Sequence, residues 1–260
     1  MTGRSKGSGG PGGAGKGGGK SRPSGRNLAV RVRTARRRKT SSTRWLQRQL
    51  NDPYVVAAKK DGYRSRAAYK LLQLDEKFKL LKKGQAVVDL GAAPGGWTQV
   101  LLHALGPRGK ILAVDVNEMD EVAGCMTLVG DATDLATEAA IRDALDGPAD
   151  LVLSDMAPPA TGHRATDHLR IIALAEAALD LARSVLAPGG GFVAKVWQGG
   201  TEGTLLADLK KDFVHVRHAK PEASRAGSAE MYVVATGYRG AGNDTDDDMD
   251  NDMDIEQREG

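Results

Sequence analysis

The sequence predicts an α/β protein with a doubly wound, mostly parallel sheet of seven strands. Beyond residue 84, short apolar runs alternate with amphipathic stretches of helical period. The first apolar run is followed directly by a glycine-rich turn, a common connection between a buried strand and a helix. The last two runs are joined by residues 219–229, which have no helical pattern, so one of these two strands is expected to run antiparallel to the rest.

The predicted strands and helices alternate in order along the chain. The strands span residues 86–90, 110–115, 126–129, 150–155, 191–197, 213–218 and 230–236. Helical patterns lie between them at residues 96–105, 135–145, 167–186 and 202–211. This alternation is what parallel strands with crossover helices require.

Two further helices are expected before the sheet. Hydroxyl residues at 41–43 can cap a short helix that contains Trp45, and Asp52-Pro53 is expected to mark its end. Ser65 can cap the second helix, whose apolar stripe lies within residues 68–78.

The second of these helices has an unexpected distribution of charge. Arg64, Arg66 and Lys70 gather around its first turns. Cations at a helix N-terminus oppose the macrodipole, so these three residues call for another explanation.

Charge divides the chain into three parts. The net charge is +4, but residues 1–50 carry fourteen Lys or Arg and no acid, and residues 243–260 carry nine Asp or Glu and one Arg. We predict a disordered basic Gly/Ser/Arg-rich tail at 1–40, a folded domain at 41–239 and a disordered acidic tail at 240–260. The basic tail suits a polyanion such as RNA, although a merely solvated tail explains its charge equally well.

Several classes of protein are disfavoured by what the sequence lacks. A single cysteine, Cys125, excludes an internal disulfide and is expected to be a buried structural thiol. No signal peptide or apolar membrane span is apparent, so a cytoplasmic protein is expected. The five histidines contain no H-E-x-x-H pair, and no metal site is predicted.

The turn after the first strand has the character of a ligand-binding loop. Gly91, Gly95 and Gly96 carry no Cβ, and a helix that begins there leaves backbone N–H groups without helical partners. The spacing is neither G-x-G-x-x-G nor that of a P-loop, which favours a nucleoside ligand with little or no phosphate. A tight turn without a ligand is the alternative.

Acidic residues close the next three predicted strands or follow them. Asp115 is placed to accept hydrogen bonds from ribose hydroxyls, and Asp131 from an adenine amino group. Asp155 ends the fourth strand. Each acid alone is more often a helix cap or turn former, but three at successive strand ends beside a glycine loop favour one binding site.

Six stretches together resemble the FtsJ/RlmE family of S-adenosylmethionine-dependent methyltransferases. They are residues 42–46, 63–71, 88–97, 154–158, 192–196 and 230–237, and the resemblance covers residues 41–239. It implies a Rossmann-like methyltransferase fold and S-adenosyl-L-methionine as the cofactor. It also implies methylation of a uridine 2′-hydroxyl in 23S ribosomal RNA of the large subunit, by a monomer with no membrane or DNA partner.

The resemblance also implies the residues of the site. Its catalytic Lys-Asp-Lys-Glu tetrad falls on Lys70, Asp155, Lys195 and Glu230. Its cofactor contacts fall on Gly95, Trp97, Asp115, Asp131 and Asp155. The tails and the substrate rim at 159–161 and 199–201 vary from the family pattern.

Elementary chemistry supports roles for these four residues. Lys195 interrupts an apolar strand, so its side chain is expected to be partly buried, and burial favours the neutral amine. Such an amine can accept a proton from a ribose hydroxyl or hold that hydroxyl in place. Asp155 would orient that amine, while Lys70 and Glu230 would fix substrate and charge. Taken singly, Lys70 reads as a solvated helix residue, Lys195 as a snorkelling strand lysine and Glu230 as an exposed strand residue.

Two other functions stay open from the sequence. The same domain could methylate another RNA, such as tRNA or a capped end. A ribosome-assembly factor that binds RNA through the basic tail is the alternative from a different class.

Overall fold

The computed structural model describes residues 43, 46–47, 49–198, 203–225 and 227–240. The predicted basic tail and, apart from Gly240, the predicted acidic tail lie outside these residues and stay predictions. The chain divides into two units, Met1–Asn51 and Asp52–Gly260. In the first unit, the described residues between 43 and 50 are helical, as the sequence predicts. The fold and the site below belong to the second unit.

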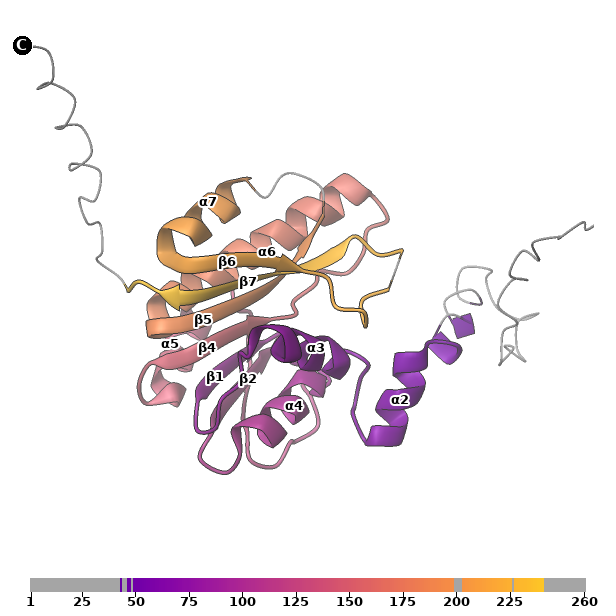
Figure 1. The fold of residues 1–260 in the computed structure, drawn as a ribbon, viewed down its shortest axis with the longest axis horizontal. Helices are drawn as coiled ribbons and strands as arrows, with labels where there is room; N and C mark the ends of the chain where they lie inside the picture. The colour runs from indigo at the N-terminus through magenta and orange to yellow at the C-terminus, as the bar shows by residue number, and fades with distance from the viewer. Residues whose placement is uncertain (1–42, 44–45, 48, 199–202, 226, 241–260) are drawn as a thin grey trace, which may run out of the picture. The chain divides into compact units, whose positions relative to one another are not determined.

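The described residues of the second unit form one seven-stranded sheet in the order β3-β2-β1-β4-β5-β7-β6 (Figure 1). Among these strands every neighbouring pair is parallel except β5 with β7 and β6 with β7, so the prediction of one antiparallel strand is confirmed. The strands are β1 (Ala86–Leu90), β2 (Lys110–Asp115), β3 (Met126–Val129), β4 (Ala149–Ser154), β5 (Leu186–Trp197), β6 (Phe213–Ala219) and β7 (Glu230–Tyr238).

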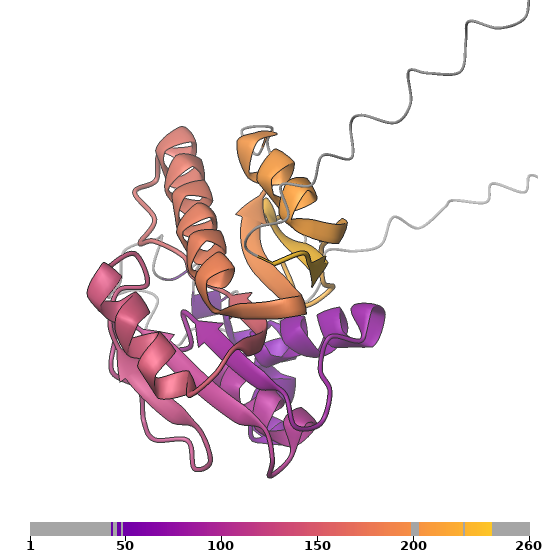
Figure 2. The same cartoon turned by 90° about the vertical axis from the view of Figure 1, so that its left-hand side faces the viewer.

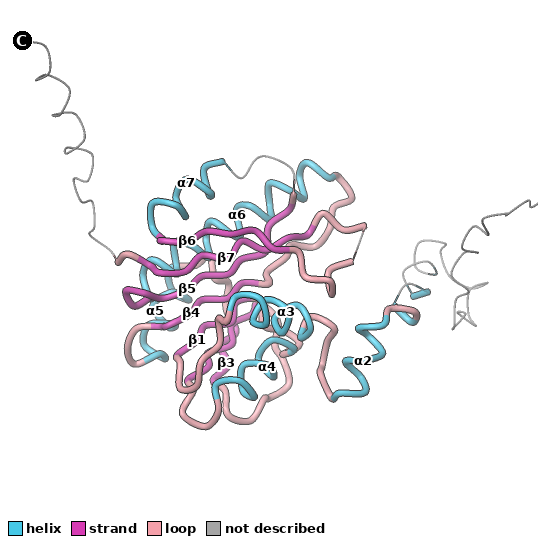
Figure 3. The backbone as a smooth tube through the Cα atoms, viewed as in Figure 1, coloured by secondary structure: helices cyan, strands magenta, loops and turns pink. Residues whose placement is uncertain are grey.

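Helices separate most of these strands along the chain (Figure 3). Their bounds are α2 (Pro53–Asp61), α3 (Ala68–Phe78), α4 (Gly96–Leu105), α5 (Leu135–Leu145), α6 (Arg164–Val185) and α7 (Gly203–Asp212). Helix α6 is the long salmon helix of Figure 2. None of the helices in the described ranges has the length and apolar character that a membrane span requires.

The start of the second unit adds one helix to those predicted and corrects one predicted cap. The helical residues described before it end at Leu50, so Asp52-Pro53 marks the end of that helix as predicted. Asp52-Pro53 also begins α2, because the Asp52 side chain accepts a hydrogen bond from Tyr54 N at 3.0 Å and proline fits the first helical position. Ser65 does not cap α3. The N-cap of α3 is Ala67, which makes no side-chain cap hydrogen bond, while Ser65 contributes its backbone oxygen to Ala68 N.

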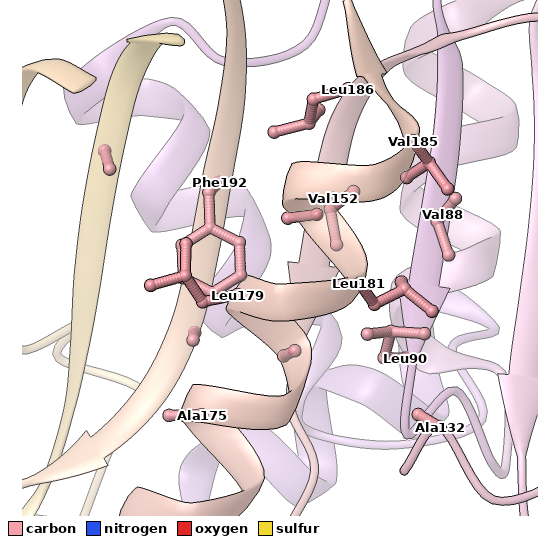
Figure 4. Close-up of a cluster of buried hydrophobic side chains, with 14 of the residues drawn as sticks. Val88, Leu90, Ala132, Val152, Ala175, Leu179, Leu181, Val185, Leu186 and Phe192 are labelled. Carbon is pink, nitrogen blue, oxygen red and sulfur yellow. The ribbon is translucent and has the colours of Figure 1, made fainter. Parts of the chain in front are cut away.

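Both faces of the sheet are covered by apolar side chains. Val87 and Val88 are neighbours in β1 but belong to different buried clusters, because successive strand residues point to opposite faces. The cluster of Val87 contains Leu71 of α3 and Leu101 of α4. The cluster of Val88 contains Leu179 of α6 (Figure 4).

The strand order reverses at β1, which lies between β2 and β4. Doubly wound sheets bind ligands beyond the carboxyl ends of the strands at such a switch point. The glycine-rich turn after Leu90 and the chain after Ser154 leave the sheet next to each other there, because these two residues are partners in the β1–β4 ladder.

Candidate functional site

Two pockets meet beyond the carboxyl ends of β1 and β4. The larger, of about 400 Å³, is lined by residues that follow β1, β2, β3 and β4. The smaller, of about 300 Å³, is lined by the turn after β1, the start of α3 and residues between 225 and 230. Gly91, Ala93 and Asp155 line both, so these residues form a shared wall.

The turn between β1 and α4 depends on glycine. Gly91 has φ +73°, and a Cβ there would lie 2.8 Å from the backbone nitrogen of Met156. Only glycine allows the two strand ends to approach this closely. Gly95 has φ +103° and is the N-cap of α4, so it shapes the turn although it lines neither pocket among the described residues.

Asp115 connects the β1 turn to the chain after β2. One carboxylate oxygen accepts a hydrogen bond from Ala93 N at 3.0 Å, and the other accepts from Asn117 N at 2.8 Å. The carboxylate lines the larger pocket. It therefore holds two walls of that pocket together, and its ribose-binding role stays a prediction.

Asp131 also lines the larger pocket, and it has a local structural task as well. One oxygen accepts hydrogen bonds from the backbone nitrogen and the hydroxyl of Thr133 at 2.9 and 2.8 Å. These hydrogen bonds lower the pKa of Asp131, which keeps the carboxylate ionised. The turn-forming and ligand-facing interpretations of this residue are thus compatible.

Trp97 lies elsewhere in the site. It is buried, its indole nitrogen donates to the backbone oxygen of Ala67 at 2.7 Å, and it lines the smaller pocket. Its ring centroid is 5.7 Å from that of Tyr232. The predicted cofactor contacts of Trp97 and Gly95 stay predictions.

The four predicted tetrad residues come together around Asp155, which lines both pockets. Lys70 and Glu230 line the smaller pocket, and Lys195 lies behind Asp155 and is not among the described residues that line either pocket. Lys195 Nζ lies 2.8 Å from Asp155 Oδ1, and Lys70 Nζ lies 2.8 Å from Glu230 Oε1. Lys70 Nζ is 3.7 Å from the same oxygen of Asp155, which links the two pairs. Lys70 and Lys195 are 8% and 7% exposed, so neither is a solvated surface lysine.

The register of the sheet explains this convergence. Asp155 follows Ser154, which is paired with Ala194 across the β4–β5 ladder, so the carboxylate reaches the next residue of β5, Lys195. Glu230 begins β7 opposite Trp197 of β5. Lys70 reaches the group from the first turn of α3.

Tyr232 completes the network, and it is absent from the residues predicted above. Its hydroxyl donates a short hydrogen bond to Asp155 Oδ1 and accepts one from Lys70 Nζ at 3.1 Å. Tyr232 is the register partner of Lys195. The signal in the sequence is its position two residues after Glu230 in one strand, which puts both side chains on one face.

Burial and charge set the protonation of the network. Burial opposes ionisation of Asp155, but the ammonium groups of Lys195 and Lys70 and the hydrogen bonds from Lys195 and Tyr232 lower its pKa. Burial, the charges of Asp155 and Glu230 and the hydrogen bond to Asp155 raise the pKa of Tyr232 well above its usual value. Asp155 is therefore a carboxylate and Tyr232 a neutral phenol that donates to it.

Glu230 is positioned from a second direction. Its Oε1 accepts a hydrogen bond from Ser224 Oγ at 2.8 Å, and its backbone nitrogen donates to Ser228 Oγ at 3.2 Å. Two ammonium groups and two carboxylates thus balance at the wall. Such a site can orient a hydroxyl in the smaller pocket, and one of its lysines can accept the hydroxyl proton once it has first released a proton of its own.

No group of three or more His, Cys, Asp or Glu side chains suited to a metal ion occurs among the described residues. Cys125 is half-buried, and burial raises the pKa of its thiol. A raised pKa keeps the thiol protonated, in agreement with the structural role expected for it.

Comparison with known proteins gives consistent matches. A family model described as FtsJ-like methyltransferase matches residues 63–238. Two relatives named ribosomal RNA large subunit methyltransferase E are similar over most of their length. That of Paramagnetospirillum magneticum is 64% identical over 223 residues, which cover 83% of this chain and 91% of the relative. That of Azorhizobium caulinodans is 59% identical over 231 residues, or 88% and 96% of the two chains.

The fold is also similar to that of a solved structure. A crystal structure described as a ribosomal RNA methyltransferase from Plasmodium falciparum matches with a TM-score of 0.62 and 30% sequence identity. The match covers 69% of this chain and 100% of that chain.

Proposed function

This chain belongs to the FtsJ-like methyltransferase family, and on that premise we propose that it methylates a uridine 2′-hydroxyl in 23S ribosomal RNA of the large ribosomal subunit. The methyl donor in this proposal is S-adenosyl-L-methionine. The observation that carries the proposal is the network of Lys70, Asp155, Lys195 and Glu230 around Asp155, the member that lines both pockets.

The larger pocket fits the proposed cofactor. Carboxylates of Asp115, Asp131 and Asp155 line it, and they suit ribose hydroxyls, an adenine amino group and a positively charged donor. Gly91 lets the turn after β1 lie directly against the backbone of Met156, because a Cβ there would clash with it. When bound, S-adenosyl-L-methionine supplies an activated methyl group on a sulfonium.

The chain's own residues then act on the acceptor. A ribose hydroxyl is a weak acid, so its oxygen must be oriented and must give up a proton as the bond to the methyl carbon forms. We assign Lys195 Nζ to steer this hydroxyl and, after it has released one proton of its own to solvent, to accept the hydroxyl proton as the bond to the methyl carbon forms. Asp155 holds Nζ in place, and Tyr232 and Lys70 hold Asp155.

The protein itself supplies every part of this arrangement. Both pockets are lined by residues of a single chain, and we propose a monomer as the active form. An enzyme of ribosomal RNA would work in the cytoplasm, where ribosomes are made.

The experiment uses S-adenosyl-L-methionine labelled in the methyl group. Unmodified large subunits, naked 23S ribosomal RNA and tRNA are offered to the full chain and to Lys195→Ala. We expect label in the large-subunit RNA as an alkali-resistant 2′-O-methyl nucleotide and a loss of about 10²-fold or more in the variant. Lys210→Ala, which removes an exposed lysine of α7, is the matched control and should keep its activity.

Other outcomes separate the alternatives. Label in tRNA instead would favour the enzyme of another RNA. Cofactor binding without label in any RNA would contradict the enzymatic assignment of the network and favour a ribosome-assembly factor.

A further inference from the structure

The smaller pocket holds more positive charge than the network at its wall needs. Arg66 and Arg225 line it, in addition to Lys70. Asp52 lies beside the two arginines and forms an ion pair with Arg66, and its Oδ2 is 3.6 Å from Arg225 Nε. Because the tetrad is already balanced, two arginines that share one carboxylate leave one excess positive charge.

Arg66 holds the protein together through both of its terminal nitrogens, while its buried Nε has no hydrogen-bond partner among the described residues. One terminal nitrogen donates to Asp52 and the other to the backbone oxygen of Ala223, both in short contacts. Its side chain is 15% exposed. Arg66 therefore fixes Asp52 and the chain just before Arg225, but it has little capacity left for a ligand.

Arg225 is the arginine that can reach a ligand. Its side chain is 38% exposed, and among the described residues its charged partner is Asp52, on the Nε side. A guanidinium carries five N–H donors in a planar fork, so the terminal nitrogens of Arg225 have donors to spare. Ser228, in the same connection before β7, also lines the pocket.

The N-terminal ends of two helices add to the positive electrostatic potential of the smaller pocket. Residues 65–67 lead into α3, and Pro94, Gly96 and Trp97 lie at the start of α4. These residues line the smaller pocket. Neither helix has an acidic residue in its first turn. Their N-terminal ends are electropositive, and they favour an anion beside Arg225.

We propose that Arg225, with Ser228, binds a phosphodiester group of the RNA strand beside the ribose that is presented to Lys195. The ligand class of the smaller pocket is thus a polynucleotide and not a free nucleoside. Asp52 is a positioning residue that holds the inner edge of the Arg225 guanidinium. This inference rests on the proposed function, because it takes the ribose to enter from the smaller pocket.

The test measures RNA affinity separately from methyl transfer. The full chain, Arg225→Ala and Arg225→Gln are titrated with a single-stranded RNA oligonucleotide at several salt concentrations. Arg142→Ala is the matched control, because Arg142 is an exposed arginine of α5 that pairs with Glu138 and lines neither pocket. All four proteins keep residues 1–40, so the contribution of the basic segment is the same in each.

We expect both Arg225 variants to bind RNA about tenfold more weakly than the full chain. The slope of log K against log salt should fall by about 0.7, the value for one phosphate contact on a single strand. Affinity for S-adenosyl-L-methionine should be unchanged, which also shows that the variants are folded. With large subunits as substrate, KM for the subunit should rise, while kcat should stay within a few fold of the value for the full chain.

Two results would overturn the inference. One is RNA affinity and salt slope of the Arg225 variants equal to those of Arg142→Ala. The other is a lower rate at saturating substrate with unchanged RNA affinity, which would give Arg225 a part in the chemical step. Absence of methyl transfer by the unchanged protein would contradict the proposed function, and the binding titrations would still decide the role of Arg225.

Discussion

At the scale of a single residue, the hydroxyl of Tyr232 connects the Lys195–Asp155 pair to the Lys70–Glu230 pair. It donates to Asp155 and accepts from Lys70, so its loss leaves a buried carboxylate and a buried ammonium each short of one partner. We predict that Tyr232→Phe lowers kcat about tenfold, because one hydrogen bond to a charged group contributes about 1.5–3 kcal/mol. Affinity for S-adenosyl-L-methionine should stay unchanged.

The control for this variant lies in the same strand. Tyr238 donates its hydroxyl to the backbone oxygen of Arg183, away from the pockets, and Tyr238→Phe removes a tyrosine hydroxyl without touching the network. Steady-state methylation assays measure kcat for Tyr232→Phe and for Tyr238→Phe. Equal kcat values for the two would contradict a positioning role for Tyr232.

Asp89 is a second residue whose effect, here on the pH dependence of stability, can be measured by itself. It is fully buried in β1, and burial raises its pKa to about 7, with the charges of Asp155 and Asp115 acting in the same direction and the hydrogen bond from Thr98 opposing them. The folded protein therefore holds a proton there that the unfolded chain releases above pH 3.8. This difference lowers the stability of the fold as the pH rises from about 4 to about 7.

Asp89→Asn should remove that dependence, because the amide is neutral at every pH. We predict that the free energy of unfolding of the variant, relative to the unchanged protein, rises by up to roughly 4 kcal/mol between pH 4 and pH 7. Urea unfolding at a series of pH values measures it. A difference that does not vary with pH would mean that Asp89 titrates normally in the fold.

At the scale of elements, the turn between β1 and α4 must pass close to the chain after β4. An alanine at Gly91 would meet the backbone of Met156 and would also need a positive φ. We predict that Gly91→Ala weakens binding of S-adenosyl-L-methionine at least tenfold, because the backbone that must move is the wall of its pocket. Calorimetric titration of the cofactor checks this.

Gly189 is the control for the backbone conformation alone. It has φ +82°, and a Cβ there would meet no atom within 4 Å. Gly189→Ala should cost about 1–2 kcal/mol of stability with unchanged cofactor affinity. Similar cofactor affinities for the two variants would show that the close approach at Gly91 has no part in binding.

The cations at the start of α3 have their explanation at this scale too. Arg64 Nη1 and Nη2 donate to the backbone oxygens of Asp120 and Glu121 at 2.7 Å each, which ties the loop after β2 to the segment before α3. Arg66 pairs with Asp52, and Lys70 with Glu230. Each cation has a partner outside the helix, and these contacts offset the unfavourable position beside the helix N-terminus.

At the scale of the whole molecule, the separation of charge along the chain predicts how RNA is attracted. Residues 1–40 contain twelve Lys or Arg and no acid. We predict that removing them weakens RNA binding and makes it less dependent on salt, because fewer counterions are released. Cofactor affinity should not change.

Removal of residues 241–260 is the matched truncation. It removes an acidic segment and should leave RNA affinity equal or higher. RNA titrations at several salt concentrations compare the two truncated proteins with the full chain. Unchanged RNA affinity after removal of residues 1–40 would favour a merely solvating role for that segment.

The sequence by itself determined the α/β class, the strands and their order along the chain, and the glycine turn, because apolar periodicity and glycine placement are local properties. It also pointed to Lys70, Asp155, Lys195 and Glu230, through the family motifs that contain them. Their separation along the chain gives no distance, so whether the four side chains meet was beyond the sequence alone.

Only the tertiary structure decided the contacts between distant segments. The β5–β7 register sets Tyr232 opposite Lys195, and a one-residue shift would turn Tyr232 to the other face of the sheet. The pairing of Asp52 with Arg66 and Arg225 joins three segments that no local pattern relates. Such contacts follow from how the layers pack, and a charge meets its partner only where the packed chain brings both to one place.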